Sequence, residues 1–216
     1  AQENDWQHRY EYFLQICKEA APKVSIIVLT YNNLEINKIC INSILEKTAY
    51  PNYELIIVDN ASIDGTKEYL QTLIDSNEKL HIVFNEENRG FAGGNNDGIQ
   101  VATGEYIVLL NNDTVITRGW LTAMSKHLEN DDKLGMCGPV TNSIGNEAMI
   151  KAVYHTQEEL QQFAYQYTMK HLNEEYADID VLAFFCTMIK KAVIEQCGLL
   201  DETYGRGMFE DDDYAE

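Results

Sequence analysis

The sequence predicts a single α/β domain in which a mostly parallel, Rossmann-like sheet carries helices on both faces. Four short stretches are too apolar to face water on either side, as expected of strands inside a parallel sheet. Three helical patterns alternate with these stretches across short polar connections, which is typical of a doubly wound sheet with right-handed crossovers. A chain of 216 residues, 45% of them hydrophobic, can form one such domain with a sizeable core.

The expected elements follow in order along the chain. The four strands and the three helices between them are residues 24–30, 34–47, 54–59, 65–76, 80–84, 91–103 and 106–110. Beyond Gly119 we expect a helix to about residue 130, a strand near residues 134–139 and a helix over residues 157–173. Before the first strand, apolar residues at helical spacing predict an amphipathic helix over residues 5–20.

We divide the chain into an N-terminal helix or connector (residues 1–22) and the α/β domain (residues 23–216). The first methionine is Met124, and the chain stops at Glu216 directly after a dense acidic motif. We therefore expect a longer protein in which this domain continues past its C-terminal residue.

Charge and cysteine content restrict the partners and the compartment. Sixteen Lys and Arg stand against 35 Asp and Glu, and the net charge of -19 would repel a polyphosphate backbone, which excludes nucleic acid as a partner. The five cysteines are odd in number and form no C-x-x-C pair, so we expect buried thiols in the cytoplasm. No apolar run approaches the roughly 18 residues that a membrane span needs.

Polar residues follow the predicted strands where each strand ends. In open α/β sheets, ligands bind outside the carboxyl ends of the strands. These positions hold Thr30-Tyr31-Asn32-Asn33, Asp59-Asn60-Ala61-Ser62, Asn88-Arg89-Gly90 and Asn111-Asn112-Asp113-Thr114. Each group alone would be ordinary turn chemistry, but their coincidence on four strands favours a ligand site.

The first strand-to-helix turn excludes the two commonest phosphate-binding loops. It contains no glycine, whereas a dinucleotide site needs G-x-G-x-x-G there, and no G-x-x-x-x-G-K-[ST] loop occurs in the chain. An anionic ligand would therefore need another positive partner. The acidic end of the fourth strand, at Asp113, is the candidate, because a carboxylate with neighbouring amide oxygens suits Mg²⁺ or Mn²⁺.

Five motifs together resemble the family 2 glycosyltransferases of the GT-A fold, and the resemblance runs from Val24 to the end of the chain. They are Ser25-Ile-Ile-Val-Leu-Thr-Tyr-Asn32, Ile57-Val-Asp-Asn-Ala-Ser62, Asn88-Arg-Gly-Phe-Ala-Gly-Gly-Asn-Asn96, Leu110-Asn-Asn-Asp-Thr114 and Phe209-Glu-Asp-Asp-Asp213. The branch that the chain resembles contains rhamnosyl- and other cell-surface-polysaccharide transferases. The resemblance implies inverting transfer of a sugar from a nucleoside-diphosphate sugar to an acceptor hydroxyl.

The resemblance also implies a nucleotide site in the first half of the chain. Residues Thr30, Tyr31 and Asn32 would surround the base and ribose, with the tyrosine stacked on the base. Asp59 would accept a ring N–H, which uracil, thymine and guanine all offer, so the donor is a UDP-, dTDP- or GDP-sugar. The alternatives are a tyrosine that caps the sheet edge and, for Asp59, an Asx-turn or a helix cap.

The glycine-rich segment of residues 90–95 opens a helix, so backbone N–H groups can approach an anion or sugar hydroxyls. In register with the family, the candidate donor contacts are Asn88, Arg89, Gly94, Asn95 and Asn112. Arg89 has the alternative of pairing with a surface carboxylate.

The D-x-D position of the family is occupied by Asn111-Asn112-Asp113. Asp113 would bind the divalent metal, Mn²⁺ or Mg²⁺, that bridges the donor diphosphate, although asparagine at the first position removes one negative charge. Asp211, in a segment that resembles the family's E-D-x-D, would deprotonate the acceptor hydroxyl. For Glu210, Asp212 and Asp213 a solvated acidic surface is an equal alternative.

The second half of the chain is expected to form the acceptor side, for a glycan or lipid-linked acceptor in surface polysaccharide or glycoconjugate synthesis. The parent protein would be cytoplasmic and work at the inner membrane surface through regions outside this chain. Two rival functions remain: a nucleotidyltransferase that makes the activated sugar, and a catalytically silent sugar- or nucleotide-binding module.

Overall fold

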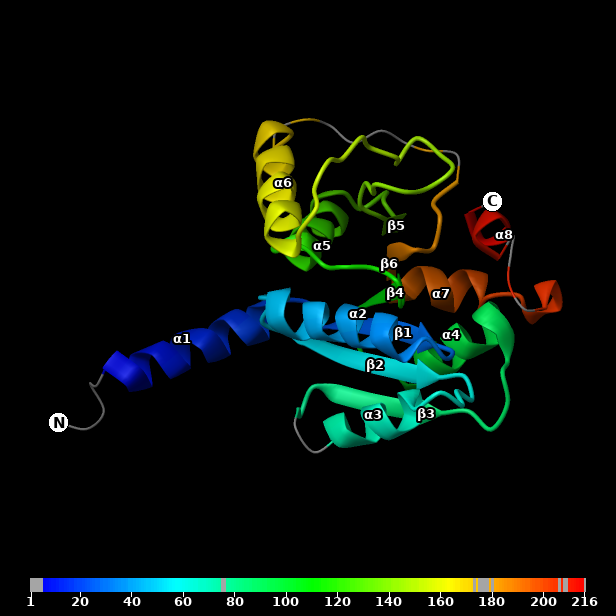
Figure 1. The fold of residues 1–216 in the computed structure, drawn as a ribbon. Helices are drawn as coiled ribbons and strands as arrows, with labels where there is room; N and C mark the ends of the chain where they lie inside the picture. The colour runs from blue at the N-terminus through cyan, green and yellow to red at the C-terminus, as the bar shows by residue number, and fades with distance from the viewer. Residues whose placement is uncertain are drawn as a thin grey trace.

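The computed structural model describes residues 6–74, 77–172, 174, 179, 181–205, 207 and 210–215. Across these residues the centre is a six-stranded sheet with the strand order β3-β2-β1-β4-β6-β5 (Figure 1). The strands are β1 (Val24–Thr30), β2 (Tyr53–Asp59), β3 (Leu80–Phe84), β4 (Tyr106–Asn111), β5 (Met136–Cys137) and β6 (Cys186–Lys190). β1 to β4 are parallel to one another, whereas β6 is antiparallel to both of its neighbours. The predicted α/β class with a mostly parallel sheet is confirmed.

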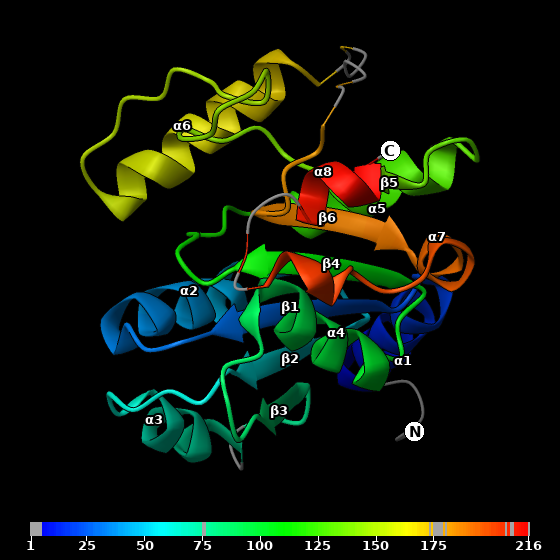
Figure 2. The ribbon, with the colours of Figure 1, turned by 90° about the vertical axis from the view of Figure 1, so that its right-hand side faces the viewer.

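Helices cover both faces of the sheet, as predicted. One face packs against α2 (Leu34–Lys47), α3 (Thr66–Leu73) and α5 (Trp120–Asn130), and the other face packs against α4 (Gly90–Val101) and α7 (Lys191–Cys197). The remaining elements are α1 (Trp6–Ala20), α6 (Gln157–Lys170), the 3-10 helix η3 (Glu202–Tyr204) and α8 (Glu210–Ala215). Figure 2 shows β1, β2 and β4 pointing one way and β6 the other, with α4 in front of the sheet.

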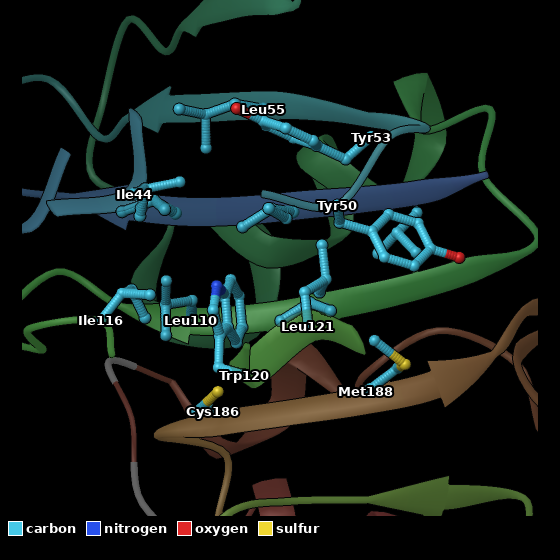
Figure 3. Close-up of a cluster of buried hydrophobic side chains, with 14 of the residues drawn as sticks. Ile44, Tyr50, Tyr53, Leu55, Leu110, Ile116, Trp120, Leu121, Cys186 and Met188 are labelled. Carbon is cyan, nitrogen blue, oxygen red and sulfur yellow. The ribbon is translucent and has the colours of Figure 1, made fainter. Parts of the chain in front are cut away.

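The core explains why the strand sequences are apolar throughout. Along β1, Ile26 and Val28 face one hydrophobic cluster while Ile27 faces the other, and all three side chains are fully buried. Figure 3 shows the first cluster. In it, the side chains of Trp120 and Leu121 from α5 pack against strands β4 and β6. Because both faces of the central strands are covered, no alternating polar positions are needed.

The antiparallel strand β6 and the short helix α7 that follows it were not predicted. β6 (Cys186–Lys190) follows an apolar segment and pairs with β4 over five residues, from Leu110↔Cys186 to Tyr106↔Lys190. β6 therefore occupies the position beside β4. The strand expected at residues 134–139 is reduced to two residues, which pair with the outer side of β6.

The cysteine prediction was correct only in part. All five cysteines are free thiols, and Cys40 and Cys186 are buried. Cys197 is exposed because it ends the short helix α7 at the surface.

Helix α1 stands at the predicted position and extends away from the sheet (Figure 1). None of its residues is buried, and Trp6, Tyr10 and Phe13 are 80%, 62% and 61% exposed. The assignment of residues 1–22 to a segment separate from residues 23–216 stays a prediction. Among the described residues, no helix has the length and apolar character to cross a membrane.

Helix α4 lies unusually close to β1 and β2, and glycine makes this approach possible. A Cβ atom on Gly98 would stand 2.5 Å from Cγ2 of Ile27 and 3.2 Å from Cγ2 of Val58, both of which are buried β-branched residues. This contact sets the distance between the third turn of α4 and strands β1 and β2.

We expect Gly98→Ala to lower the free energy of unfolding by about 1–3 kcal/mol, because the added methyl overpacks a rigid core. Chemical denaturation of the variant and the wild type measures this difference. Gly145→Ala is the matched control, because its Cβ would meet nothing within 4 Å, and we expect a change within about 0.5 kcal/mol. Equal stability of the two variants would contradict the proposed close packing.

Candidate functional site

The parallel pairing brings three polar strand ends to one edge of the sheet. Thr30 of β1 is in register with Asp59 of β2, and Leu29 of β1 is in register with Asn111 of β4. The turns that follow these strands therefore begin side by side, at the edge where open α/β sheets bind ligands. The structure thus brings together three of the predicted site residues, Thr30, Asp59 and Asn112.

Asp59 is 1% exposed, and its carboxylate is already part of a local hydrogen-bond pattern. One oxygen accepts from the Thr30 hydroxyl at 3.3 Å, and the other accepts from the backbone N–H of Ser62 at 3.2 Å. The second contact closes an Asx-type turn, which was one of the alternatives for this residue. A carboxylate oxygen has two lone pairs, so these contacts leave acceptor capacity for a ligand.

The turn after β1 presents an aromatic ring at the edge of the site. Tyr31 is 47% exposed, and the two residues after it, Asn32 and Asn33, adopt left-handed backbone angles with φ of 55° and 61°. Asparagine tolerates this conformation better than most residues. Asn32 is held by one backbone and one side-chain hydrogen bond. Its N–H donates to Oγ of Ser62, and its Oδ1 accepts from the N–H of Ile63.

Asn60, which follows Asp59, connects the second strand end to the start of α4. Its Nδ2 donates to Oδ1 of Asn88 and to the carbonyl of Gly90, both at 3.0 Å. Its Oδ1 accepts from Nδ2 of Asn85 and from the N–H of Arg89, both at 3.1 Å. The side chain is 2% exposed, so these contacts satisfy the whole amide away from water.

Arg89 takes the alternative partner that the sequence offered, because its guanidinium pairs with surface carboxylates. One nitrogen contacts Asp97 of α4, and the other donates to both carboxylate oxygens of Glu202 in η3 at 3.1 Å. Although burial acts in the opposite direction, the two carboxylates raise the pKa of Arg89 above its usual value. The pair with Glu202 holds the segment near residue 200 against α4. Binding of a donor by Arg89 stays a prediction.

The glycine-rich start of α4 is packed against the sheet. A Cβ on Gly94 would overlap the end of the Leu29 side chain and stand 3.2 Å from Nδ2 of Asn60, so glycine lets α4 approach the sheet closely here. Asn95 is 2% exposed, and its Nδ2 donates to the carbonyl of Phe91 one turn earlier. The predicted donor contacts at Gly94 and Asn95 stay predictions.

The turn after β4 exposes the predicted metal ligand. Asp113 is exposed, while Nδ2 of Asn112 donates to Oδ1 of the buried Asn37 at 2.6 Å. Below the turn, the thiol of Cys40 lies 3.7 Å from the carbonyl of Asn111. Burial raises the pKa of Cys40 to about 11, so this thiol stays protonated and does not compete for a cation.

Asp211 lies on a different element, the short helix α8. It is half-buried and lines a hollow of about 410 Å³ together with Ile144, Gly145, Asn146, Val181, Ala183 and Asp212. The ring of Tyr214 packs on Phe184 with centroids 5.9 Å apart, and the Tyr214 hydroxyl donates to the carbonyl of Gly198. Burial raises the pKa of Tyr214 to about 12, so its hydroxyl remains a donor that holds α8 in place.

The hollow is connected to the carboxyl end of β4 because β6 is antiparallel. The residues before β6 therefore pass the end of β4, where the N–H of Asn111 donates to the carbonyl of Phe185 at 2.8 Å. Ala183, two residues earlier, is part of the hollow that Asp211 lines. The segment of residues 183–185 therefore contacts the end of β4 through Phe185 and lines the hollow of Asp211 through Ala183.

Comparison with known proteins identifies the family. A family model described as "Glycosyl transferase family 2" matches residues 25–198. The chain belongs to this family. It is 37% identical over 92 residues to the putative teichuronic acid biosynthesis glycosyltransferase TuaG of Bacillus subtilis, which covers 43% of this chain and 36% of that protein.

Two solved structures are similar to this family 2 member in fold. The mannosyltransferase PcManGT from Pyrobaculum calidifontis, in complex with GDP-Man and Mn²⁺, has a TM-score of 0.67 and 20% identity, covering 96% of this chain and 57% of that chain. GalNAc-T7 with UDP, GalNAc and Mn²⁺ has a TM-score of 0.70 and 16% identity, covering 91% and 40%. The predicted GT-A fold and family are confirmed, whereas the rhamnosyltransferase-like branch stays a prediction.

Three residues of this family 2 member were missed by the sequence analysis, although they organise the site: Asn37, Asn60 and Glu202. Asn60 is part of the motif Ile57-Val-Asp-Asn-Ala-Ser62, and its position at the end of a strand could have identified it as a site residue. Asn37 lies in the first turn of a predicted helix and Glu202 in a segment with no predicted element. Nothing in their local pattern distinguishes them from solvent-facing polar residues.

Asn60→Asp should lower the free energy of unfolding by about 1–3 kcal/mol, because a carboxylate oxygen would face the acceptors Asn88 and Gly90 without a donor. The deficit relative to wild type should shrink toward about pH 4, where the new carboxyl regains a proton. Urea denaturation at pH 7 and at pH 4 measures both. The exposed Asn142→Asp is the control, and an equal, pH-independent loss in both variants would contradict the assignment.

Proposed function

We propose that this family 2 member binds a nucleoside-diphosphate sugar at the carboxyl ends of β1, β2 and β4 and transfers the sugar, with inversion, to an acceptor hydroxyl. The observation that carries the proposal is the register that aligns Thr30 with Asp59 and Leu29 with Asn111. It gathers one base-reading carboxylate and one exposed aspartate at a single edge. A second aspartate, Asp211, lines a hollow beside that edge.

The nucleoside part of the donor is bound between Tyr31 and Asp59. Asp59 accepts the ring N–H of uracil, thymine or guanine, and its burial strengthens such a hydrogen bond because little water competes. Tyr31 offers an exposed ring on which a base can stack, an interaction worth about 1–3 kcal/mol. UDP, dTDP and GDP are therefore the nucleotides to test.

The sugar and phosphates extend toward the start of α4 and the turn after β4. Asn88, Asn95 and Asn112 supply amide groups there, and Gly94 permits the close approach of α4. Arg89 contributes only when one of its two carboxylate pairs opens, since both ends of its guanidinium are engaged with Asp97 and Glu202.

The residues present fit a hard divalent cation. Asp113 offers an exposed carboxylate next to asparagine side chains, and among the described residues no group of three or more His, Cys, Asp and Glu forms a complete metal cage. Mg²⁺ and Mn²⁺ suit such a site, because Mg²⁺ usually takes one or two carboxylates plus the phosphates of the substrate. When bound, the ion would neutralise the charge of the diphosphate.

Asp211 acts as the base in the transfer. Its carboxylate takes the proton of the acceptor hydroxyl as the hydroxyl oxygen bonds to the anomeric carbon. The bond from that carbon to the diphosphate oxygen breaks at the same time, and the nucleoside diphosphate leaves with the electron pair. A single displacement of this kind inverts the anomeric configuration.

The acceptor is a glycan or a lipid-linked sugar in the synthesis of a surface polysaccharide. The similarity to TuaG, a putative teichuronic acid biosynthesis glycosyltransferase, supports this class of product. Such acceptors are extended at the inner membrane surface, where we place the parent protein, on the cytoplasmic side.

Binding of a nucleoside diphosphate should be at least about tenfold tighter with Mn²⁺ than with EDTA, and Asp113→Ala should remove most of this difference. The reason is that an anionic ligand needs a cation in a protein of net charge -19. Isothermal titration calorimetry with UDP, dTDP and GDP measures the affinities. Asp132→Ala, which removes an exposed carboxylate elsewhere, is the control and should behave as wild type. Equal affinities in Mn²⁺ and EDTA would refute the metal site.

Asp211→Asn should lower kcat by about 10²–10⁴ while donor affinity stays nearly constant, because the amide keeps the shape but cannot accept the proton. The turnover assay uses the whole parent protein with its donor and acceptor. Asparagine also preserves the hydrogen bond that Oδ1 accepts from the N–H of Asp212.

The neighbouring Asp212→Asn is the matched control, because Asp212 lines the same hollow but is exposed. It should turn over at a rate near wild type. An α-linked donor should give a β-linked product by NMR. A product with retained configuration, or normal turnover of Asp211→Asn, would remove Asp211 from the mechanism.

A further inference from the structure

Asn37 in the first turn of α2 is a fully buried polar side chain. The neighbouring buried positions of α2 include Cys40, Ile41 and Ile44. An apolar residue would fill this position without the cost of removing an amide from water. The amide must therefore be offset by the contacts that it makes.

Those contacts join three turns that belong to different strands. Nδ2 of Asn37 donates to the carbonyl of Asn32 at 2.7 Å, in the turn after β1, and to Oγ1 of Thr66 at 3.1 Å, beyond β2. Oδ1 of Asn37 accepts from Nδ2 of Asn112 at 2.6 Å, in the turn after β4. Both amide hydrogens and the carbonyl oxygen are thus used.

Further hydrogen bonds make the first two turns behave as one unit. Oδ2 of Asp64 accepts from the N–H of Leu34, and Oδ1 of Asp64 accepts from the N–H and the hydroxyl of Thr66. Within this unit Asn32 and Ala61 keep left-handed backbone angles, with φ of 55° and 65°. Backbone conformations of this kind persist only when the surrounding contacts determine them.

The turn after β4 is tied to this unit through Asn112. Asn112 is half-buried, and the next residue along the chain is the exposed Asp113. A shift of the turn that carries Tyr31 would move the carbonyl of Asn32, then the amide of Asn37, and then Asn112. The nucleotide end and the metal end of the site therefore share one buried amide.

We propose that Asn37 is a positioning residue that couples nucleotide binding at Tyr31 and Asp59 to metal binding at Asp113. The proposal rests on the function proposed above. Asn37 touches neither ligand, and it acts by holding Asn112, and with it Asp113, in the place that suits the diphosphate of a bound nucleotide. Metal and nucleotide then strengthen each other's binding by the same factor.

The test measures how much Mn²⁺ tightens binding of whichever of UDP, dTDP and GDP the wild type binds best. The ratio of the dissociation constant in EDTA to that in Mn²⁺ should fall at least about fivefold in Asn37→Leu, a typical size for coupling between two sites. The dissociation constant in EDTA should change much less. Asn112→Ala, which removes the same hydrogen bond from the surface side, should lower the ratio equally, and the double variant should lower it no further.

Asn96→Leu is the matched control for a loss of stability alone. Asn96 is also buried and also makes three hydrogen bonds, to the N–H and carbonyl of Leu200 and to Glu202. Both leucine variants should lower the melting temperature, but only Asn37→Leu should lower the ratio. If Asn37→Leu does not fold, the smaller Asn37→Ala takes its place in the same measurements, because Asn112 is itself a proposed donor contact and Asn112→Ala alone does not isolate Asn37.

The outcomes separate the two proposals. A wild type that binds nucleotide more tightly with Mn²⁺, together with an unchanged ratio in Asn112→Ala or Asn37→Leu, overturns the coupling role and leaves the proposed function intact. A wild type that binds none of the three nucleotides overturns the proposed function, and the coupling role with it. A reduced ratio in Asn96→Leu as well would also overturn the specific role of Asn37.

Discussion

The candidate site depends on the parallel register of β1 with β2 and β4. The strands pair residue by residue, from Val24 with Tyr53 and Tyr106 up to Thr30 with Asp59 and Leu29 with Asn111. A slip of one residue would exchange the side chains that face the two buried clusters, because successive side chains alternate, and the differently shaped side chains would no longer fit these close-packed clusters. The two buried clusters therefore fix the register, and the register fixes which polar residues meet at the carboxyl edge.

Neutral amides hold that edge together, which leaves the carboxylates available for ligands. Asn37 and Asn60 use both the nitrogen and the oxygen of their amides in connections between turns, while Asn32 accepts through Oδ1 and Asn112 donates through Nδ2. Carboxylates in the same places would repel one another in a chain of net charge -19 and would lack donors for the carbonyls that they face. Amides avoid both costs, and an exposed Asp113 adds a single local charge where a cation would bind.

The sequence predicted most of the first half of the fold and the positions of the polar strand ends. This succeeded because strands buried on both faces, such as residues 24–30, are continuous apolar runs. The polar residue at which each run stops then marks the end of the strand. β6 was missed because its partner and direction depend on a distant pairing with β4. Asn37 was missed because a polar residue within a helix resembles a solvent-facing one, and only the packing of α2 shows that it is buried. Arg89 and Asp59 show a third limit, since a motif names candidate contacts without saying which local partners already occupy them.

Because β6 lies between β4 and β5, the long segment that connects β5 to β6 starts and ends on the same side of the sheet. After β5 the chain leaves the sheet at residue 138 and re-enters it at Cys186 beside β4, so the whole excursion begins and ends at one border of the sheet. No strand on the β1, β2 and β3 side pairs with any described part of it. The residues directly before β6 are tied to the end of β4, since the N–H of Asn111 donates to the carbonyl of Phe185. The earlier residues of this excursion can change in length and sequence without altering the pairing of β1 with β2 and β4. Under the proposed function, the surface that receives the acceptor could therefore change while the donor site keeps its form.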